Sequence, residues 1–204
     1  IYQSLSSPLK YLRKFNKSEI DYEIKQIINE VNLKEEFLNR FPHEFSGGQA
    51  QRIGIARVLL SKAKIIILDE PVSALDVSVQ SQILNLLNDL QKKFKLSYIV
   101  ISHDLAVIEA ICDRVSVMYF GEIVENAKSN DLFNRPLHPY TNLLLNSIPK
   151  IDQKIKIKNL VETELPDPIN PPKGCAFYSR CEKKIDKCKD LNPEEIFKKN
   201  RGFK

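Results

Sequence analysis

The first clear hydrophobic pattern in the chain is helical and lies between residues 17 and 31. Its apolar positions recur at a spacing that places them on one face of a helix: Ile20, Ile24, Ile27, Ile28 and Val31. Ser18 precedes them, with Asp21 three residues later, a spacing typical of a helix start. We therefore predict an amphipathic helix capped by Ser18, and Pro42 breaks the helical pattern that follows.

A second helical pattern comes after a serine and two glycines. Ser46, Gly47 and Gly48 precede Gln49, and apolar residues then recur at roughly helical spacing: Ile53, Ala56, Val58, Leu59 and Leu60. The first N–H groups of a helix have no partner within it, and the helix dipole is positive there. Glycines also let a ligand approach the backbone. The start of this helix is therefore a candidate site for phosphate oxygens, with the Ser46 hydroxyl as a further donor.

Two apolar, β-branched runs predict parallel strands. Residues 65–68 form the first run, and Asp69 and Glu70 follow it directly. The second run covers residues 96–102 and is followed by His103, with an amphipathic helical pattern between the two runs. A strand, helix and strand in this order predict a right-handed parallel crossover with strands buried on both faces. His103 is then expected beside Asp69 and Glu70, at the sheet edge where α/β proteins bind ligands.

The remaining residues predict a hairpin and a tail. Residues 114–120 and 122–125 flank Gly121 like two antiparallel strands, and Ser129 is a candidate cap for a short helix. From about Lys150 the chain becomes rich in proline and lysine, which predicts a separate C-terminal appendage. We therefore divide the chain into three parts: a partial helical subdomain at 1–45, a core at 46–149 and a C-terminal appendage at 150–204.

Composition narrows the classes of protein that the chain fits. A chain of 204 residues with 43% hydrophobic and 28% charged residues has the balance of a globular protein. No apolar run approaches the roughly 20 residues that a membrane helix needs. The net charge of +5 comes from the tail, where basic residues alternate with acids and isoleucine, so we expect a solvated surface and no nucleic acid. The first residues contain no secretory apolar region, and we expect them to lie inside a longer chain. The four cysteines do not have the pattern of a secreted disulfide scaffold, so we expect a reducing compartment.

Four short motifs in order resemble the ATP-binding subunit of an ABC transporter. They are SGGQ at 46–49, the apolar run ending in DEP at 69–71, SALD at 73–76 and ISHD at 101–104. PLHPYT at 136–141 and INPPKGC at 169–175 are similar to the oligopeptide and dipeptide importers of that family. The resemblance implies an α/β fold: a partial P-loop NTPase-like ABC ATPase core with a parallel sheet, a helical subdomain, antiparallel strands and a small appendage.

The resemblance also implies roles for single residues. Asp69 would hold Mg²⁺, Glu70 would activate the attacking water, and His103 would contact the γ-phosphate of ATP. Asp76 would couple two active sites across a dimer interface. Ser46 to Gln49 would bind the ATP that the opposite subunit holds, so catalysis would require two chains.

The partners and the location follow from the same resemblance. A second ABC ATPase subunit would complete the dimer, and transmembrane permease subunits would hold it at the cytoplasmic face of the membrane. An extracytoplasmic peptide-binding protein would act with it indirectly. ATP hydrolysis would drive peptide transport, with ATP and Mg²⁺ as cofactors.

One expected element of the family has no counterpart in these residues. The phosphate-binding loop G-x-x-x-x-G-K-[ST] is absent, since no Gly-Lys dipeptide occurs in the chain. We therefore expect the chain alone to be inactive. Two alternatives stay open: a truncated, non-catalytic fragment that donates its SGGQ face to a partner, and a soluble ABC-type ATPase.

The tail contains three cysteines at a spacing that suggests a metal cluster. Cys175, Cys181 and Cys188 lie six and seven positions apart, which is wider than the spacing that zinc prefers. Some peptide importers that this chain resembles carry a [4Fe-4S] cluster on such cysteines, with a fourth ligand downstream. No fourth cysteine follows here, and Cys112 lies in another part of the chain. Cluster ligands and ordinary reduced thiols remain two readings of this pattern.

Overall fold

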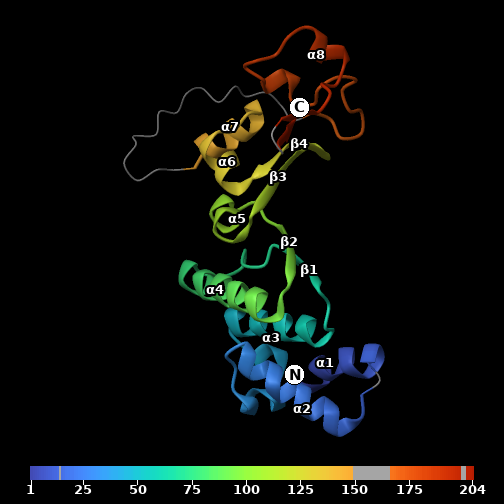
Figure 1. Cartoon of the computed structure of the whole chain (residues 1–204), viewed down its shortest axis with the longest axis vertical. Coiled ribbons are helices and arrows are strands. Elements are labelled where there is room, and N and C mark those ends of the chain that lie inside the picture. The colour runs from blue at the N-terminus through green and yellow to red at the C-terminus, as the bar shows by residue number, and fades with distance from the viewer. Residues whose placement is uncertain (14, 149–165, 199–200) are drawn as a thin grey trace. The chain divides into compact units, whose positions relative to one another are not determined.

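The described residues of the chain form two compact units, Ile1–Ile111 and Cys112–Lys204. A computed structural model describes residues 1–13, 15–148, 166–198 and 201–204 (Figure 1). The two units are defined by the contacts between their residues. The division of the chain into three parts, with boundaries after residues 45 and 149, remains a prediction. None of the helices in the described ranges is both long and apolar enough to cross a bilayer.

The first unit begins with helices. α1 (Tyr2–Pro8) continues into a π-helical turn at Leu9–Arg13, and α2 (Lys17–Glu30) follows. Two 3₁₀ turns, Glu35–Asn39 and Pro42–Glu44, then lead to α3 (Gly47–Leu60). The amphipathic helix expected near residues 17–31 is confirmed, and its isoleucines enter the core of this unit.

The predicted cap of α2 was wrong by two residues. Asn16 is the N-cap, because its side chain accepts the N–H of Glu19 at 3.0 Å. The Glu19 carboxylate accepts the N–H of Asn16 in return, which completes a capping box. Ser18 instead donates its hydroxyl to the Asn16 side chain at 2.7 Å. Asp21 stands at the same spacing from Ser18, but its carboxylate accepts the Tyr2 hydroxyl, whereas Glu19 bonds back to Asn16.

A strand, a helix and a second parallel strand follow α3, as predicted. β1 (Ile65–Asp69) pairs with β2 (Ser97–Ile101), and α4 (Val77–Phe94) joins them. The register pairs residues from Ile65 with Ser97 through to Asp69 with Ile101. The strands therefore end level with one another, which brings the residues after them to one edge of the sheet.

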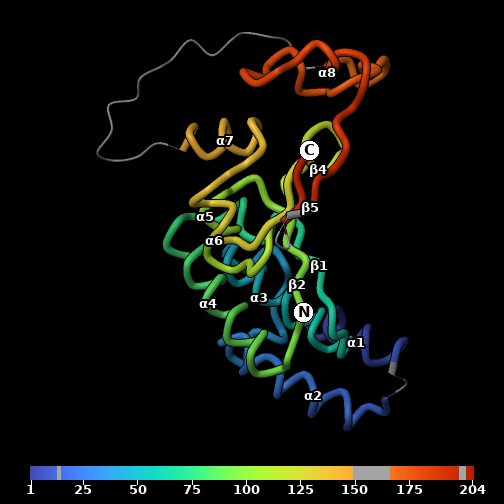
Figure 2. Tube along the Cα trace, turned by 45° about the horizontal axis from the view of Figure 1, so that its top comes forward, coloured from blue at the N-terminus to red at the C-terminus, as the bar shows by residue number. Residues whose placement is uncertain are grey.

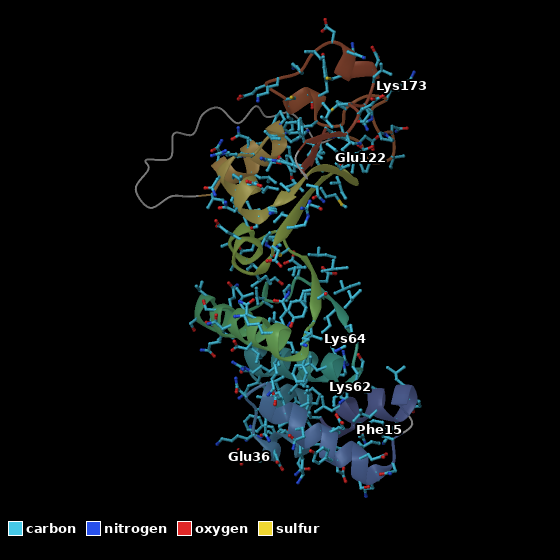
Figure 3. All side chains as sticks on the ribbon, in the orientation of Figure 1. Phe15, Glu36, Lys62, Lys64, Glu122 and Lys173 are labelled. Atoms are coloured by element: carbon cyan, nitrogen blue, oxygen red, sulfur yellow. The ribbon has the colours of Figure 1, made fainter. Side chains whose placement is uncertain are left out.

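Side-chain hydrogen bonds fix α4 against this sheet. The Tyr98 hydroxyl donates to the Leu87 carbonyl at 3.0 Å, and burial raises the pKa of Tyr98 to about 12. Lys64, directly before β1 (Figure 3), donates its side-chain ammonium to the Phe94 carbonyl at the end of the helix. These bonds hold α4 on the face that carries Ile66 and Tyr98.

The prediction that both strands are buried on both faces was wrong. Ile66 is buried on the face toward the helices, but the neighbouring positions on each strand are exposed. The helices of this unit cover only one side of the two strands (Figure 1). The all-apolar pattern of the strands predicted that other elements pack on both faces of the sheet. In the described part of the chain, helices pack on one face only.

The second unit is built on a four-stranded antiparallel sheet. β3 (Arg114–Tyr119) and β4 (Glu122–Lys128) form the predicted hairpin, which turns at Phe120 and Gly121. Both turn residues have positive φ, 51° and 82°, as a two-residue hairpin turn requires. β5 (Ile196–Lys198) and β6 (Arg201–Phe203) extend the sheet in the order β3, β4, β6, β5. The C-terminus lies beside β4 (Figure 2). The last residues of the chain thus pair with the hairpin.

Short helices complete the two units. α5 (Leu105–Ile111) ends the first unit, and α6 (Ser129–Asn134), α7 (Pro139–Asn146), a 3₁₀ turn at Tyr178–Arg180 and α8 (Lys187–Asp190) belong to the second. The expected helix at Ser129 is confirmed, but Lys128 holds the cap position without a side-chain bond. A small aromatic core lies here, in which Tyr119 contacts Tyr140 and Phe177.

A buried carboxylate holds the parts of the second unit together. Glu125 on β4 is 1% exposed and accepts the N–H groups of Leu137 and His138 at the start of α7. Arg201 on β6 donates to the same carboxylate at 2.6 Å and also to the Arg135 carbonyl. Burial alone would raise the pKa of Glu125, but the bonds from Arg201 and the His138 N–H outweigh it and lower the pKa. The Glu125 carboxylate therefore links β6 and the start of α7 to the hairpin.

Replacing Arg201 should loosen this unit strongly. Arg201→Met leaves the Glu125 charge buried with fewer donors, which we expect to cost about 3 kcal/mol of unfolding free energy. Urea unfolding, with amide exchange at 122–128 as the local readout, measures the loss. The double variant Glu125→Gln/Arg201→Met is the control, because it removes the charge as well and should recover part of the loss. Equal stability of Arg201→Met and the unchanged chain would contradict the role of the ion pair.

The same unit should lose stability in acid. Burial lowers the pKa of His138 below its usual 6.5, so the unfolded state binds a proton before the folded state does. The stabilisation is complete above pH 6.5 and declines as the pH falls toward the lowered value. Glu125, whose pKa is lowered from 4.5, adds a second decline below that pH. Thermal unfolding between pH 7.5 and 4 should show the first decline in the unchanged chain and a smaller one in His138→Gln.

Candidate active site

The carboxyl ends of β1 and β2 bring Glu70 and His103 into contact. The Glu70 N–H donates to the Ile101 carbonyl at 2.9 Å, which continues the pairing of the strands by one residue. Glu70 has a φ of 47°, in the left-handed region that side chains rarely adopt. Its carboxylate accepts the His103 N–H at 3.2 Å and lies 2.8 Å from His103 Nδ1. A strained backbone thus aims the carboxylate at the histidine that follows β2.

The contact sets the protonation of the histidine. The hydrogen bond and charge of Glu70 raise the pKa of His103, because they favour a proton on Nδ1. The imidazole is 81% exposed, so its other nitrogen, Nε2, faces solvent. When the ring is protonated, Nε2–H can donate to an anion while Nδ1–H stays bonded to Glu70. A phosphate oxygen has the right chemistry for that donor.

Asp69 lies beside this pair with a free carboxylate. It ends β1 at an exposed position, and within the described residues its side chain has no hydrogen-bond or ion-pair partner. Carboxylate oxygen is the ligand that Mg²⁺ prefers, and this ion usually keeps several waters. The described ranges contain no group of three or more His, Cys, Asp or Glu side chains arranged to hold a metal ion. The residues present fit a Mg²⁺ that Asp69 holds together with water and a phosphate.

The start of α3 has the predicted form. The Ser46 hydroxyl accepts the Gln49 N–H at 3.4 Å, and the Gln49 side chain accepts the Ser46 N–H at 3.1 Å. This capping box uses both side chains and leaves the N–H groups of Gly47 and Gly48 without an acceptor in the described part of the chain. Two donors at the positive end of a fourteen-residue helix can receive an anion.

The two glycines also have a packing role that the sequence pattern did not reveal. A Cβ on Gly47 would lie 3.0 Å from a Leu75 methyl group, and a Cβ on Gly48 would lie 2.5 Å from a Val79 methyl group. The start of α3 therefore packs directly on the segment that begins α4. Glycine is needed here for close approach to the protein's own side chains as well as for ligand access.

Asp76 and Gln80 shape the segment between β1 and α4. Asp76 is the N-cap of α4 and accepts the Val79 N–H at 3.0 Å; this bond is the main reason that its pKa is lowered. Gln80 donates its side-chain amide to the carbonyls of Val72 and Leu75 at 3.1 and 3.0 Å. Sequence reasoning missed Gln80. The only signal was its position one helical turn after the cap, from which an amide can reach back to the preceding turn.

The predicted site residues fall into two groups. Glu70 and His103 touch one another, and Asp69 is adjacent in the chain. Ser46 to Gln49 instead contact the start of α4, and no hydrogen bond or ion pair in the described ranges joins them to Glu70 or His103. That the two groups serve different nucleotides stays a prediction.

The tail cysteines form no recognisable metal site. Cys175, Cys181 and Cys188 are half-buried free thiols, and burial raises the pKa of Cys175. The Cys175 N–H donates to the Cys188 carbonyl at 2.9 Å, so the backbone segments that carry these two cysteines are in contact. No metal-binding group of three or more ligands occurs among the residues that the structure describes. The iron–sulfur prediction therefore gains no support.

Comparison with known families gives two matches. The ABC transporter family matches residues 2–73, and the oligopeptide/dipeptide transporter C-terminal region matches residues 124–188. A solved structure of cbiO1 from Clostridium perfringens, part of the ABC transporter complex cbiONQ, has a TM-score of 0.60 and 30% identity. It covers 66% of this chain, which covers 53% of that one. The predicted α/β fold of ABC ATPase type is thereby confirmed.

Curated relatives are similar over nearly the whole chain. The oligopeptide transport ATP-binding protein OppF of Escherichia coli is 48% identical over 95% of this chain, and AppF of Bacillus subtilis is 45% identical over 93%. The dipeptide transport ATP-binding protein DppF of Haemophilus influenzae is 47% identical over 93%. The chain spans only about three fifths of their length, 59% of OppF and 58% of DppF.

The close approach at Gly48 can be tested by one methyl group. Gly48→Ala forces the new Cβ against Val79, which we expect to cost about 1–3 kcal/mol of unfolding free energy. Val79→Ala should restore part of that stability when combined with Gly48→Ala. Gly54→Ala is the matched control on the same helix, since a Cβ there meets nothing within 4 Å. Additive losses in the double variant would refute the contact.

Proposed function

We propose that the chain is the ATP-binding and ATP-hydrolysing part of a peptide importer of the ABC transporter family, because it matches that family at residues 2–73 and the oligopeptide/dipeptide type at residues 124–188, and is 45–48% identical to transport ATP-binding proteins. One structural observation supports this proposal most directly. Glu70 and His103 meet at the carboxyl ends of two adjacent parallel strands, which is where α/β proteins bind ligands.

Glu70 acts as the general base. One of its carboxylate oxygens is held by His103, and the other is free to accept a proton from water. The fixed backbone at Glu70 limits the directions in which the carboxylate can point, so the base is positioned before water arrives. A positioned base of this kind contributes about 10²–10⁴ in rate.

His103 holds the γ-phosphate. Its Nδ1 bond to Glu70 fixes the ring and leaves Nε2 to donate to a phosphate oxygen. The raised pKa increases the fraction of rings that carry a positive charge, which favours an anionic ligand. Asp69 would bind the Mg²⁺, which supplies charge neutralisation at the phosphates.

The start of α3 binds a second nucleotide. The N–H groups of Gly47 and Gly48 and the dipole of α3 would receive the γ-phosphate of ATP bound to a second ATPase subunit. Asp76 and Gln80 hold the segment on which this helix start packs, so they connect it to the strand that Glu70 follows. Transport would then follow from closing and opening of the dimer. Transmembrane permease subunits, which would hold the chain at the cytoplasmic face of the membrane, and an extracytoplasmic peptide-binding protein would take part.

A non-catalytic role is the second candidate. Residues 1–204 contain no Gly-Lys dipeptide, and the curated relatives are longer than the matched region. The chain by itself would then provide the SGGQ face to a partner's nucleotide without turning over its own. Its proposed binding of phosphate by Gly47 and Gly48 is common to both candidates.

Measuring Mg-ATP binding by the isolated chain tests whether residues 1–204 bind the nucleotide without the rest of an ATPase subunit. We expect titration calorimetry of the 204-residue chain with Mg-ATP to show no binding in the micromolar range, since no phosphate-binding loop is present. Micromolar affinity would contradict this expectation. A chimaera in which residues 1–204 replace the matching part of OppF should bind Mg-ATP.

Mixing experiments separate the two candidates. If the chain is only a donor of the SGGQ face, ATP hydrolysis appears when it is mixed with an intact ATPase partner, and Glu70→Gln leaves that activity unchanged. If Glu70 is a catalytic base, the chimaera itself hydrolyses ATP, and Glu70→Gln removes its own turnover. Gly54→Ala, which changes neither group of site residues, is the control in the mixture and in the chimaera.

A further inference from the structure

The turn that follows β1 holds Glu70 in a backbone conformation that side chains rarely adopt. The φ of Glu70 is 47°, and Pro71 directly after it disfavours a right-handed helical alternative. Such a conformation persists only where neighbouring groups fix it. The Glu70 N–H donates to the Ile101 carbonyl at 2.9 Å, and the Glu70 carbonyl accepts the Ser73 hydroxyl at 3.2 Å and the Ser73 N–H at 3.4 Å. The turn at residues 70–75 therefore helps to set the direction of the Glu70 carboxylate.

Gln80 holds this turn from the helix that follows it. It lies in the first turn of α4, and its amide Nε2 donates to the Val72 carbonyl at 3.1 Å and to the Leu75 carbonyl at 3.0 Å. The Val72 carbonyl also accepts the Leu75 N–H at 3.1 Å, which closes the turn. Ser73, which bonds to Glu70, lies between the two residues that Gln80 holds. Gln80 therefore fixes the backbone on both sides of Ser73.

The two acceptors determine which side chain can take this position. Both are carbonyl oxygens, so the group that reaches them must donate two hydrogen bonds. The glutamine amide has two N–H groups and no charge, whereas an ionised carboxylate of the same length only accepts. A leucine of similar size neither donates nor accepts. Glutamate and leucine at residue 80 therefore remove the two bonds in different ways.

The contact between Glu70 and His103 reports whether the turn is held. The Glu70 carboxylate lies 2.8 Å from His103 Nδ1, and its hydrogen bond and charge raise the pKa of the imidazole. The charge of Asp104 raises the same pKa to a smaller extent. If the turn relaxes, Glu70 leaves the ring, and the pKa of His103 falls toward its usual 6.5.

We propose that Gln80 is a positioning residue for the general base: its amide holds the turn at residues 70–75 and thereby keeps the Glu70 carboxylate against His103. Gln80 acts through the backbone of the turn and needs no contact with the nucleotide. Its effect on rate rests on the proposed function of Glu70, whereas its effect on the contact with His103 does not.

ATP hydrolysis by the chimaera with OppF, assembled with its ATPase partner, tests the effect on rate. Gln80→Leu and Gln80→Glu should each lower kcat at least about tenfold and change KM for Mg-ATP by less than about twofold, because a misplaced base slows the chemical step. Gln91→Leu, about three turns further along α4, is the matched control and should change neither constant.

Titration of the histidine NMR signals of the 204-residue chain tests the contact without turnover. Both Gln80 variants should lower the pKa of His103, and Glu70→Gln gives the shift expected when the charge of Glu70 is removed. His138 belongs to the other unit, so its lowered pKa should stay the same and serves as the internal reference.

Three results would overturn the proposal. The first is an unchanged pKa of His103 in both Gln80 variants, and the second is hydrolysis by both within about twofold of the unchanged chimaera. The third is a parallel loss of Mg-ATP binding and hydrolysis, which would make Gln80 a structural residue of its unit. Glu70→Gln distinguishes these failures from failure of the proposed function. If Glu70→Gln hydrolyses ATP normally, Glu70 is not the base; if it is inactive while the Gln80 variants are normal, only the role of Gln80 is wrong.

Discussion

The parallel pairing of β1 with β2 is the constraint on which the candidate site depends. Its register ends with Asp69 opposite Ile101, and the Glu70 N–H extends the pairing by one more bond. Because both strands end at the same level, the acid after one and the histidine after the other come within 2.8 Å. A shift of register would separate them while leaving each motif intact. The chemistry therefore depends on the sheet, although the motifs are read from short segments.

The second half-site depends on close packing. Gly47 and Gly48 allow α3 to lie against Leu75 and Val79, and Gln80 holds the carbonyls of the same segment. Both half-sites are therefore attached to the short connection between β1 and α4. A change in either one can reach the other through residues 71–80, without any direct contact between them. In the proposed dimer, this connection is the segment through which the two half-sites would be coupled.

Much of the fold could be predicted from periodicity. The helix at 17–30, the helix after Ser46, the parallel crossover and the hairpin at Gly121 all follow from local patterns, and these patterns agree with the tertiary contacts. Asn16 was missed as a cap because two neighbouring residues compete for the same role. The buried ion pair of Glu125 could not be predicted either. Its partner Arg201 is 76 residues away, and only the folded sheet brings the two together. The exposed face of β1 and β2 was missed because an apolar strand does not reveal which residues cover it.

Hydrolysis by the chimaera with OppF, assembled with its ATPase partner, tests the central claim most directly. If the ends of β1 and β2 form the catalytic centre, Glu70→Gln retains Mg-ATP binding and lowers the hydrolysis rate by about 10² or more. Glu109→Gln, an exposed change on α5, should leave the rate unaltered. Hydrolysis by Glu70→Gln within about twofold of the unchanged chimaera would contradict the assignment of this site.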